Sequence, residues 1–327
     1  MMRKKITIVA EGGVSMGMGH IMRMLELARL LKKDVDVSFL SRSSERNTAL
    51  YQAGIDRVQK YGFEVAVYSV EKLVDLLPYV SADLLLIDSY DVTEEFFVYA
   101  NKIVPVTAYM DDEKIIPIID ANIVINQNIY GCDITYESSK TILKLLGIDY
   151  LILRDEFVDN PPKIIQEDIK RIMITLGGSD SHNYTETILK QLYTRNYHIR
   201  VVIGPAFAHS NTLEKYRSSK MELCYDAKMS EIMNWCDIAI TSCGSTAYEI
   251  LAMGVPAIGL AVADNQIDLI NYLSQKDLML KGDLYDINSA LKKLTYDKRK
   301  NISSAAQKCV DGRGKKRIAA NLLGMIR

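Results

Sequence analysis

The sequence has few cysteines, almost no net charge and no long apolar run. Its five cysteines include no Cys-x-x-Cys pair and no cluster with histidine, which argues against a disulfide scaffold and against a zinc site. Forty Lys and Arg residues balance 41 Asp and Glu residues, so the overall charge favours neither nucleic acid nor an anionic membrane surface. We therefore expect no metal centre and no nucleic-acid partner.

Signals for export and for membrane insertion are also missing. The apolar stretches fall well short of the roughly 18 residues that a spanning helix needs. The basic residues 1–5 are followed by a run of only five residues before Glu11, which is too short for the apolar region of a secretory signal. We expect a soluble, cytoplasmic protein without a membrane span. The sequence leaves its oligomeric state open.

Short apolar runs rich in β-branched residues alternate with segments of helical periodicity along most of the chain. This alternation predicts βα units around a parallel sheet. It stops in a polar stretch near 159–168 and then resumes, so a chain of 327 residues is expected to form two domains. The predicted strands are 6–10, 35–40, 65–68, 84–87, 104–109, 123–125, 171–176, 200–203, 221–224, 238–241 and 256–261.

The expected fold class is α/β, with two Rossmann-like domains facing each other across a cleft. The predicted boundaries are 1–158 for a sugar-binding and catalytic domain, 169–305 for a nucleotide-binding domain and 306–327 for a C-terminal helix. Open α/β domains bind ligands at the carboxyl ends of their strands. The residues that bind and react with a ligand are therefore expected in the loops that follow the predicted strands.

The first such loop is rich in glycine and ends in a histidine. Gly17 and Gly19 let backbone N–H groups approach an anion or a sugar, and the start of a helix favours negative charge. His20 is predicted in the first turn of the next helix, where the helix dipole disfavours imidazolium and keeps the ring neutral. A neutral imidazole facing the cleft is a candidate general base. The alternative is a solvated histidine beside a tight turn.

A second loop in the other domain combines small and hydroxyl-bearing residues at a predicted helix start. Such residues offer N–H and O–H donors to a diphosphate. Glu249, one turn further, has a carboxylate that can accept ribose hydroxyls. The alternative for the loop is helix capping without a ligand, and the alternative for Glu249 is an exposed charge on the helix. The loop residues are Ser242, Gly244, Ser245 and Thr246.

Two more loops follow strands of the same domain. Gly177 and Gly178 are placed to close over the same phosphate, although a plain turn has the same sequence. Asn265 and Gln266 carry amides that can read sugar hydroxyl or acetamido groups. Cys243 is interpreted as a small buried thiol because no histidine lies near it in the sequence. Together, the four loops predict a nucleotide-sugar site.

Several motifs occur in a fixed order along nearly the whole chain. They are Met16–His20 with Arg23, Leu86–Tyr90, Met110–Asp112, Asn126–Tyr130, Leu153–Phe157, Leu176–Asp180, Gly244–Glu249, Asp264–Gln266 and Asp311–Gly314. In this order the chain resembles the UDP-sugar hydrolases of the pseudaminic acid pathway (PseG), which are related to two-domain GT-B glycosyltransferases such as MurG.

The resemblance implies hydrolysis of a UDP-linked 2,4-diacetamido-2,4,6-trideoxyhexose in nonulosonic acid biosynthesis, without a metal or cofactor. Water would attack the anomeric carbon and UDP would leave. By motif position, His20 would activate the water, Asp88 and Tyr90 would lie at the sugar, and Asn265 would contact it. The loop 244–246 and Glu249 would bind UDP.

The chain departs from that family at two places in its first domain. Ser89 stands where the family often has histidine, and Val9 and Glu11 stand where it has arginine and aspartate. The identity of the sugar therefore stays open. Two alternatives also remain: a GT-B glycosyltransferase in which His20 activates a hydroxyl acceptor, and a non-catalytic UDP-sugar-binding module.

Overall fold

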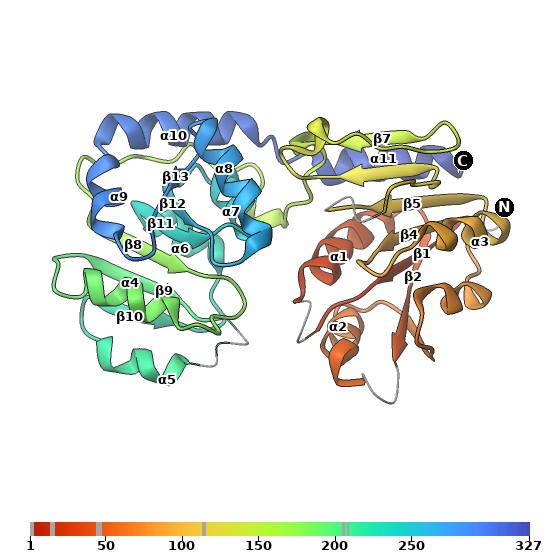
Figure 1. The fold of residues 1–327 in the computed structure, drawn as a ribbon, viewed down its shortest axis with the longest axis horizontal. Helices are drawn as coiled ribbons and strands as arrows, with labels where there is room; N and C mark the ends of the chain where they lie inside the picture. Colours follow the sequence, from red (N-terminus) through yellow and green to blue (C-terminus); the bar gives the residue numbers. More distant parts are fainter. Residues whose placement is uncertain (1–2, 14–16, 44–47, 113–115, 205–206, 208) are drawn as a thin grey trace. The chain divides into compact units, whose positions relative to one another are not determined.

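The computed structural model describes residues 3–13, 17–43, 48–112, 116–204, 207 and 209–327. The chain divides into two compact units: Met1–Arg154 with Gly312–Arg327, and Asp155–Asp311. Each unit contains one parallel β-sheet with helices on its faces (Figure 1). The predicted α/β class with two Rossmann-like halves is confirmed.

The sheet of the first unit has seven strands in the order β3-β2-β1-β4-β5-β6-β7. Alternate residues of β4 belong to two separate cores, because Leu84 and Leu86 pack on one face and Leu85 and Ile87 on the other. A strand covered on both faces is continuously apolar, which is the pattern seen in the sequence. The strands are β1 (Lys5–Ala10), β2 (Asp36–Ser43), β3 (Val65–Ser69), β4 (Leu84–Asp88), β5 (Val106–Met110), β6 (Ile123–Asn126) and β7 (Leu143–Leu146), and the helices are α1 (Gly19–Leu31), α2 (Thr48–Lys60), α3 (Glu94–Ile103) and α11 (Gly314–Met325).

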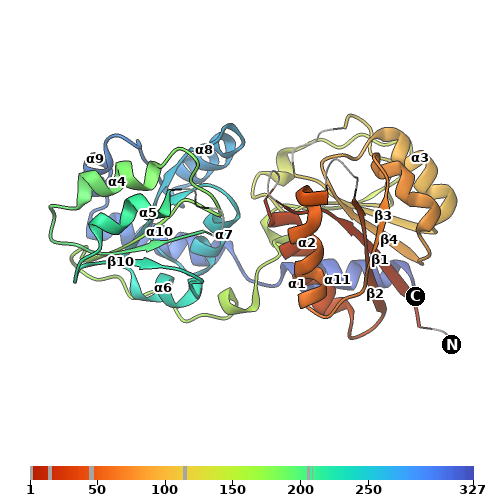
Figure 2. The ribbon, with the colours of Figure 1, turned by 90° about the horizontal axis from the view of Figure 1, so that it is seen from below.

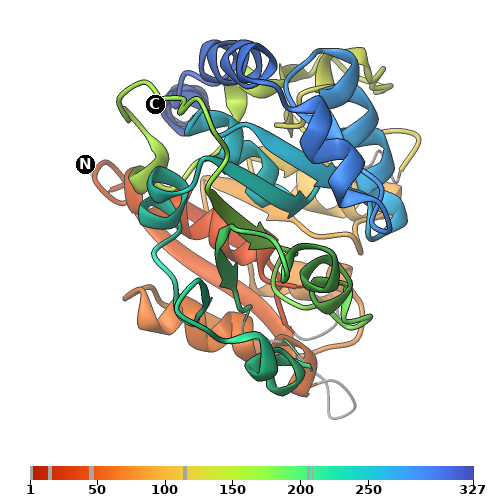
Figure 3. The same ribbon diagram turned by 90° about the vertical axis from the view of Figure 1, so that its left-hand side faces the viewer.

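The sheet of the second unit has six strands in the order β10-β9-β8-β11-β12-β13 (Figure 3). Its strands are β8 (Arg171–Thr175), β9 (His198–Val202), β10 (Met221–Cys224), β11 (Ile238–Ser242), β12 (Ala257–Leu260) and β13 (Leu280–Lys281). Its helices are α4 (Tyr184–Leu192), α5 (Ser210–Leu213), α6 (Met229–Trp235), α7 (Ser245–Ala252), α8 (Ile267–Gln275), α9 (Ile287–Lys293) and α10 (Tyr296–Cys309). Strands β7 and β13 were not predicted, because both are short edge strands without β-branched residues.

Both sheets reverse their strand order beside their first strand, between β1 and β4 and between β8 and β11. At such a point the loops leaving two neighbouring strands diverge to opposite faces of the sheet, and a crevice opens at the carboxyl ends. The loops after these four strands are therefore the places in each unit where a ligand fits best. They include the glycine-rich loops singled out in the sequence.

The expected single helix over 306–327 is corrected to two helices. Residue Gly312 has a φ of +68°, a left-handed conformation that ends the run between α10 and α11. Helix α11 then packs beside α1 in the first unit (Figure 2), where Lys315 Nζ lies 3.1 Å from Glu26 Oε2 in a buried ion pair. Ile318 and Leu322 complete the core on that face. Helical periodicity could not predict this return, because it does not say which unit a helix packs against.

Replacing Gly314 with alanine should destabilise the docking of α11. A Cβ at this position would lie 2.2 Å from the carbonyl oxygen of Leu151, so backbone would have to move. We expect Gly314→Ala to lower the free energy of unfolding by about 1–3 kcal/mol, measured as a lower urea midpoint. Gly324→Ala, in the same helix with no atom within 4 Å of its Cβ, is the matched control and should not lower it. Equal midpoints for the two variants would contradict the docking argument.

Among the described residues, no helix combines the length and the apolar character that crossing a bilayer requires.

Candidate active site

The glycine-rich loop after β1 leads directly into α1. Gly17 has a φ of +75° and exchanges two backbone hydrogen bonds of 2.9 Å with Gly13. Helix α1 begins at Gly19, so His20 lies in its first turn, as predicted. Residues 14–16, which include Met16 of the family motif, lie outside the described residues.

His20 is paired with the carboxylate at the end of the neighbouring strand. Strands β1 and β4 are adjacent, and Asp88, the last residue of β4, is fully buried. Its Oδ1 lies 2.5 Å from His20 Nδ1. This carboxylate can only accept a hydrogen bond in its ionised form, so Nδ1 carries the proton and the lone pair of the neutral ring is on Nε2. Tyr90 lies edge-on to the imidazole at 4.5 Å between ring centroids and is 38% exposed. Three predicted site residues therefore meet at the switch point of this sheet.

An arginine and a second aspartate extend this pair. Arg23 donates from Nε to Asp88 Oδ2 at 2.6 Å and from Nη2 to Asp88 Oδ1 at 2.5 Å. Its Nη1 lies 2.8 Å from a carboxylate oxygen of Asp112. Sequence reasoning named these residues only as motif members. The available signal was positional, since Arg23 follows His20 by three residues on one helix face and Asp112 follows the predicted strand next to that of Asp88.

The direction of the His20 pKa shift differs from the expectation. Burial on its own would lower the pKa of His20, but attraction and hydrogen bonding to Asp88 more than offset it, and the pKa is raised above 6.5. The expected lowering of this pKa by the helix dipole is therefore wrong in direction. A full negative charge at 2.5 Å outweighs the partial positive charge at a helix start. Burial also raises the pKa of Asp88, but the Arg23 and His20 charges hold that pKa below its usual range.

A second buried network joins the two positions at which the chain departs from the family. Ser89 Oγ donates to Glu11 Oε2 at 2.7 Å, so these two residues contact each other directly. Arg42, at the end of β2, binds the other Glu11 oxygen at 2.5 Å and also forms an ion pair with Asp91. The network holds the loop after β4, which carries Tyr90. Arg42 was not among the predicted site residues, although it lies two residues after the end of a predicted strand.

The glycine loops of the second unit meet around the ends of β8, β9 and β11. Gly177 has a φ of +92°, and a Cβ there would lie 3.6 Å from Ser242 Oγ. A Cβ on Gly204, after β9, would lie 2.6 Å or less from the carbonyl oxygens of Gly177 and Gly178. Gly204 is thus required for this close approach, and the sequence analysis missed it.

The start of α7 has the features of an anion site. Gly244 precedes the helix and offers no side chain to cap its first turn, and no acidic residue lies in that turn. A Cβ on Gly244 or Gly178 would meet no atom within 4 Å. Ser245 is exposed and Thr246 is half-buried. A helix start preceded by glycine, beside other open glycines, suits a phosphate.

The remaining predicted residues of this unit lie on or near the same strand ends. Glu249 is half-buried in α7, one turn from its start. Asn265 and Gln266 belong to a short 3₁₀ segment, η6 (Asp264–Gln266), after β12. Gln266 Oε1 accepts a hydrogen bond from Val262 N at 3.1 Å, so this amide holds its own loop. Cys243 is buried, and burial raises its pKa to about 12, which confirms the interpretation as a packed thiol.

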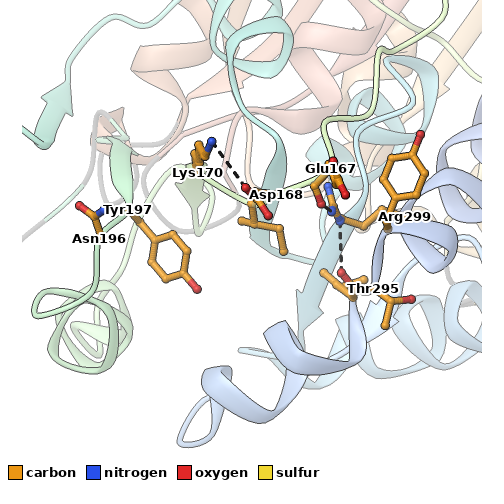
Figure 4. A pocket seen from close by; sticks show the side chains of 10 residues that line it. Glu167, Asp168, Lys170, Asn196, Tyr197, Thr295 and Arg299 are labelled. Atoms are coloured by element: carbon orange, nitrogen blue, oxygen red, sulfur yellow. Dashed lines mark hydrogen bonds and ion pairs between the residues drawn. The ribbon is translucent and has the colours of Figure 1, made fainter.

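A cavity of about 430 Å³ in the second unit lies away from these loops (Figure 4). Its lining residues Lys170 and Tyr197 directly precede β8 and β9, so it lies at the amino ends of the strands. The Arg299 guanidinium on its wall donates to the carbonyl oxygens of Leu294, Gln166 and Glu167 at 3.1, 2.8 and 2.6 Å. The guanidinium of Arg299 is thus hydrogen-bonded to backbone carbonyls. None of the predicted site residues lines the cavity. Within the described residues, no group of three or more His, Cys, Asp or Glu side chains is placed to hold a metal ion.

Residues 171–320 match the family model of the glycosyltransferase family 28 C-terminal domain. The chain is 30% identical over 275 residues to an uncharacterised protein of Methanocaldococcus jannaschii, covering 78% of this chain and 55% of that protein. It is 25% identical over 342 residues to the spore coat polysaccharide biosynthesis protein SpsG of Bacillus subtilis, covering 97% of each. It is 24% identical over 280 residues to the UDP-2,4-diacetamido-2,4,6-trideoxy-beta-L-altropyranose hydrolase of Campylobacter jejuni, covering 83% of this chain and 97% of the hydrolase.

Among solved structures, MurG of Acinetobacter baumannii superposes with a TM-score of 0.67 at 12% identity, covering 98% of this chain and 99% of MurG. The two parallel sheets and this likeness define a protein of the GT-B fold. More narrowly, its residues 171–320 are related to the C-terminal domain of family 28 glycosyltransferases, and the chain is distantly homologous to SpsG and to the Campylobacter hydrolase. It spans only about half the length of the Methanocaldococcus relative.

Proposed function

We propose that this chain hydrolyses a UDP-linked 2,4-diacetamido-2,4,6-trideoxyhexose in nonulosonic acid biosynthesis. The observation that carries the proposal is the His20–Asp88 pair, with Tyr90 against the ring, at the switch point of the first sheet. A histidine oriented by a buried carboxylate is suited to take a proton from water. The similarity to the Campylobacter hydrolase, which extends over 97% of that enzyme, supports the substrate class.

In the proposed reaction, His20 Nε2 accepts a proton from water while the water oxygen forms a bond to the anomeric carbon. The bond between that carbon and the β-phosphate oxygen breaks, and its electron pair leaves with UDP. Asp88 keeps the Nδ1 proton in place and stabilises the imidazolium that forms. Water is a poor nucleophile at neutral pH, so a positioned base is needed to remove a proton as the water attacks.

In this proposal the second unit binds the nucleotide. The glycines after β8 and β11 and the N–H groups at the start of α7 would bind the diphosphate and stabilise the charge of the leaving group. A diphosphate is already a good leaving group, so the proposed reaction uses no metal or cofactor. Glu249 would accept the ribose hydroxyls and Asn265 would contact the sugar. The diphosphate ligands would be Gly177, Gly178, Ser242, Gly244, Ser245 and Thr246.

Glu249→Ala should weaken UDP binding. Loss of a charge-assisted hydrogen bond to ribose costs on the order of 2 kcal/mol, which corresponds to an increase of about 30-fold in Kd. Isothermal titration of UDP into wild type and variant measures this difference. Glu231→Ala, whose side chain is 70% exposed on α6, is the control and should leave the affinity unchanged. Equal UDP affinity for Glu249→Ala and wild type would remove the ribose assignment.

The pH dependence of hydrolysis follows from the raised pKa of His20. A general base works only when it is deprotonated, and Asp88 raises the pKa of His20 above 6.5. The rate of UDP release should therefore fall as the pH decreases through a midpoint above 6.5, and the group should be fully active only at higher pH. A profile of kcat/KM against pH measures this midpoint. A midpoint below 6.5 would contradict the proposed role of the pair.

The family 28 match favours a second candidate function, transfer of the sugar to an acceptor. In that reaction the same imidazole would deprotonate an acceptor hydroxyl instead of water. UDP release from a panel of UDP-diacetamido-trideoxyhexoses separates the two functions. Release without acceptor supports the hydrolase, and release only after addition of an acceptor supports the transferase. Binding of UDP-sugar without turnover under either condition would instead favour a non-catalytic binding module.

A further inference from the structure

We infer that Arg23 and Asp112 set how strongly His20 holds its proton, and that the two residues act in opposite directions. Both belong to one line of alternating charges: His20, Asp88, Arg23 and Asp112. The effect on the rate rests on the proposed function. The effect on proton binding by the imidazole does not rest on that function, so the inference and the proposed function can be tested separately.

The geometry makes Asp88 a shared partner. Its Oδ1 accepts from His20 Nδ1 at 2.5 Å and from Arg23 Nη2 at 2.5 Å, while its Oδ2 accepts from Arg23 Nε at 2.6 Å. Arg23 Nη2 and His20 Nδ1 are only 3.1 Å apart, and both are donors toward the same oxygen. The contact between them is therefore repulsive whenever the imidazole is protonated. Arg23 thus competes with His20 for the charge of Asp88.

Asp112 moderates this competition from the other side of the guanidinium. Its carboxylate lies 2.8 Å from Arg23 Nη1, the nitrogen that does not contact Asp88. The negative charge of Asp112 offsets part of the arginine charge, so more of the field of Asp88 acts on the imidazole. Removing Asp112 should consequently lower the proton affinity of the His20 imidazole, and removing Arg23 should raise it.

Burial makes these charges effective. Asp88 is fully buried, and the side chains of Arg23 and Asp112 are only 12% and 17% exposed. Little solvent separates the groups, so their interactions are screened far less than surface ion pairs. The groups that face His20 are Asp88 from β4, Arg23 from α1, Asp112 after β5, and Tyr90 from the loop after β4. Consistent with the geometry, the Arg23 charge lowers the pKa of His20 and the Asp112 charge raises it.

The experiment is a proton NMR titration of the imidazole Cε1–H signals in the full chain. The chain has four histidines, and the His20 signal is the one missing from His20→Asn. Arg23→Gln should move the His20 titration midpoint upward by about one pH unit, since a like charge in close contact is removed. Asp112→Asn, which still accepts a hydrogen bond from Arg23, should move it downward. Arg23→Lys keeps the charge and should stay near wild type.

Arg200→Gln, a partly exposed arginine on β9, is the control and should leave the His20 midpoint unchanged. A downward or absent shift in Arg23→Gln would overturn the inference, and so would an upward or absent shift in Asp112→Asn. If Arg23→Gln does not fold, the direction in which Asp112→Asn shifts the His20 titration midpoint tests the inference by itself. Should the shifts occur as expected while the wild type releases no UDP, the inference would stand and the hydrolase proposal would fall.

Discussion

His20→Asn should reduce acceptor-independent UDP release by about 10²- to 10⁴-fold, the range in which a positioned general base contributes to rate. Asparagine removes the titrating nitrogen but still offers an amide N–H to Asp88, so the buried carboxylate keeps a donor. The loss should therefore appear in kcat, with UDP affinity nearly unchanged. A coupled assay of UDP release over a range of substrate concentrations measures both quantities.

His198→Asn is the control for this variant. His198 is an exposed residue at the start of β9, in the other unit, and its replacement should leave the rate unchanged. Retention of wild-type kcat by His20→Asn would contradict the assignment of His20 as the base. A large increase in KM with unchanged kcat would also contradict it, because that result indicates a binding role.

Asp88→Asn should reduce UDP release by about 10⁴-fold, as expected when a carboxylate that fixes a catalytic imidazole is replaced by an amide. An amide can donate its N–H to Nδ1, which favours the tautomer with the proton on Nε2. The nitrogen that must accept the proton from water is then already occupied. Asp83→Asn is the control and should retain full activity, because the Asp83 carboxylate, just before β4, contacts Lys4 and the backbone N–H of Lys5 and lies outside the His20 network.

The Asp88→Asn variant also leaves the buried Arg23 guanidinium without its main counter-charge, so a loss of stability is expected alongside the loss of activity. Adding Arg23→Gln to Asp88→Asn removes that charge, for which Asp112 is the remaining partner. The double variant should regain part of the thermal stability without regaining UDP release. Recovery of activity in the double variant would show that Asp88 acts only through folding.

The sequence predicted the strands that position the site because buried parallel strands are continuously apolar and end at recognisable polar residues. His20 could be found at a strand end, and Asp88 and Tyr90 could be grouped with it only through the order of the motifs shared with the family that the chain resembles. The link through Arg23 to Asp112 could not be predicted in the same way. It depends on β5 being the neighbour of β4, and strand order is a property of the sheet that local patterns do not contain.

The direction of the His20 pKa shift was predicted wrongly for a related reason. A helix start is visible in sequence, whereas a carboxylate 2.5 Å from Nδ1 is a tertiary contact between residues 68 positions apart. The same holds for the contact between Ser89 and Glu11, which joins two departures from the family pattern that the sequence showed only as separate substitutions. The return of α11 to the first unit is likewise set by packing, through Lys315 and Glu26.

The most direct test of the account is hydrolysis of a UDP-diacetamido-trideoxyhexose in ¹⁸O-labelled water without any acceptor, with the mass of the released UDP measured. Attack of water on the anomeric carbon predicts prompt release of UDP that contains no ¹⁸O. Label in UDP would place the attack at phosphorus, and an absence of UDP release until a sugar acceptor is added would identify a transferase. Either result would contradict hydrolysis at the anomeric carbon by water activated at His20.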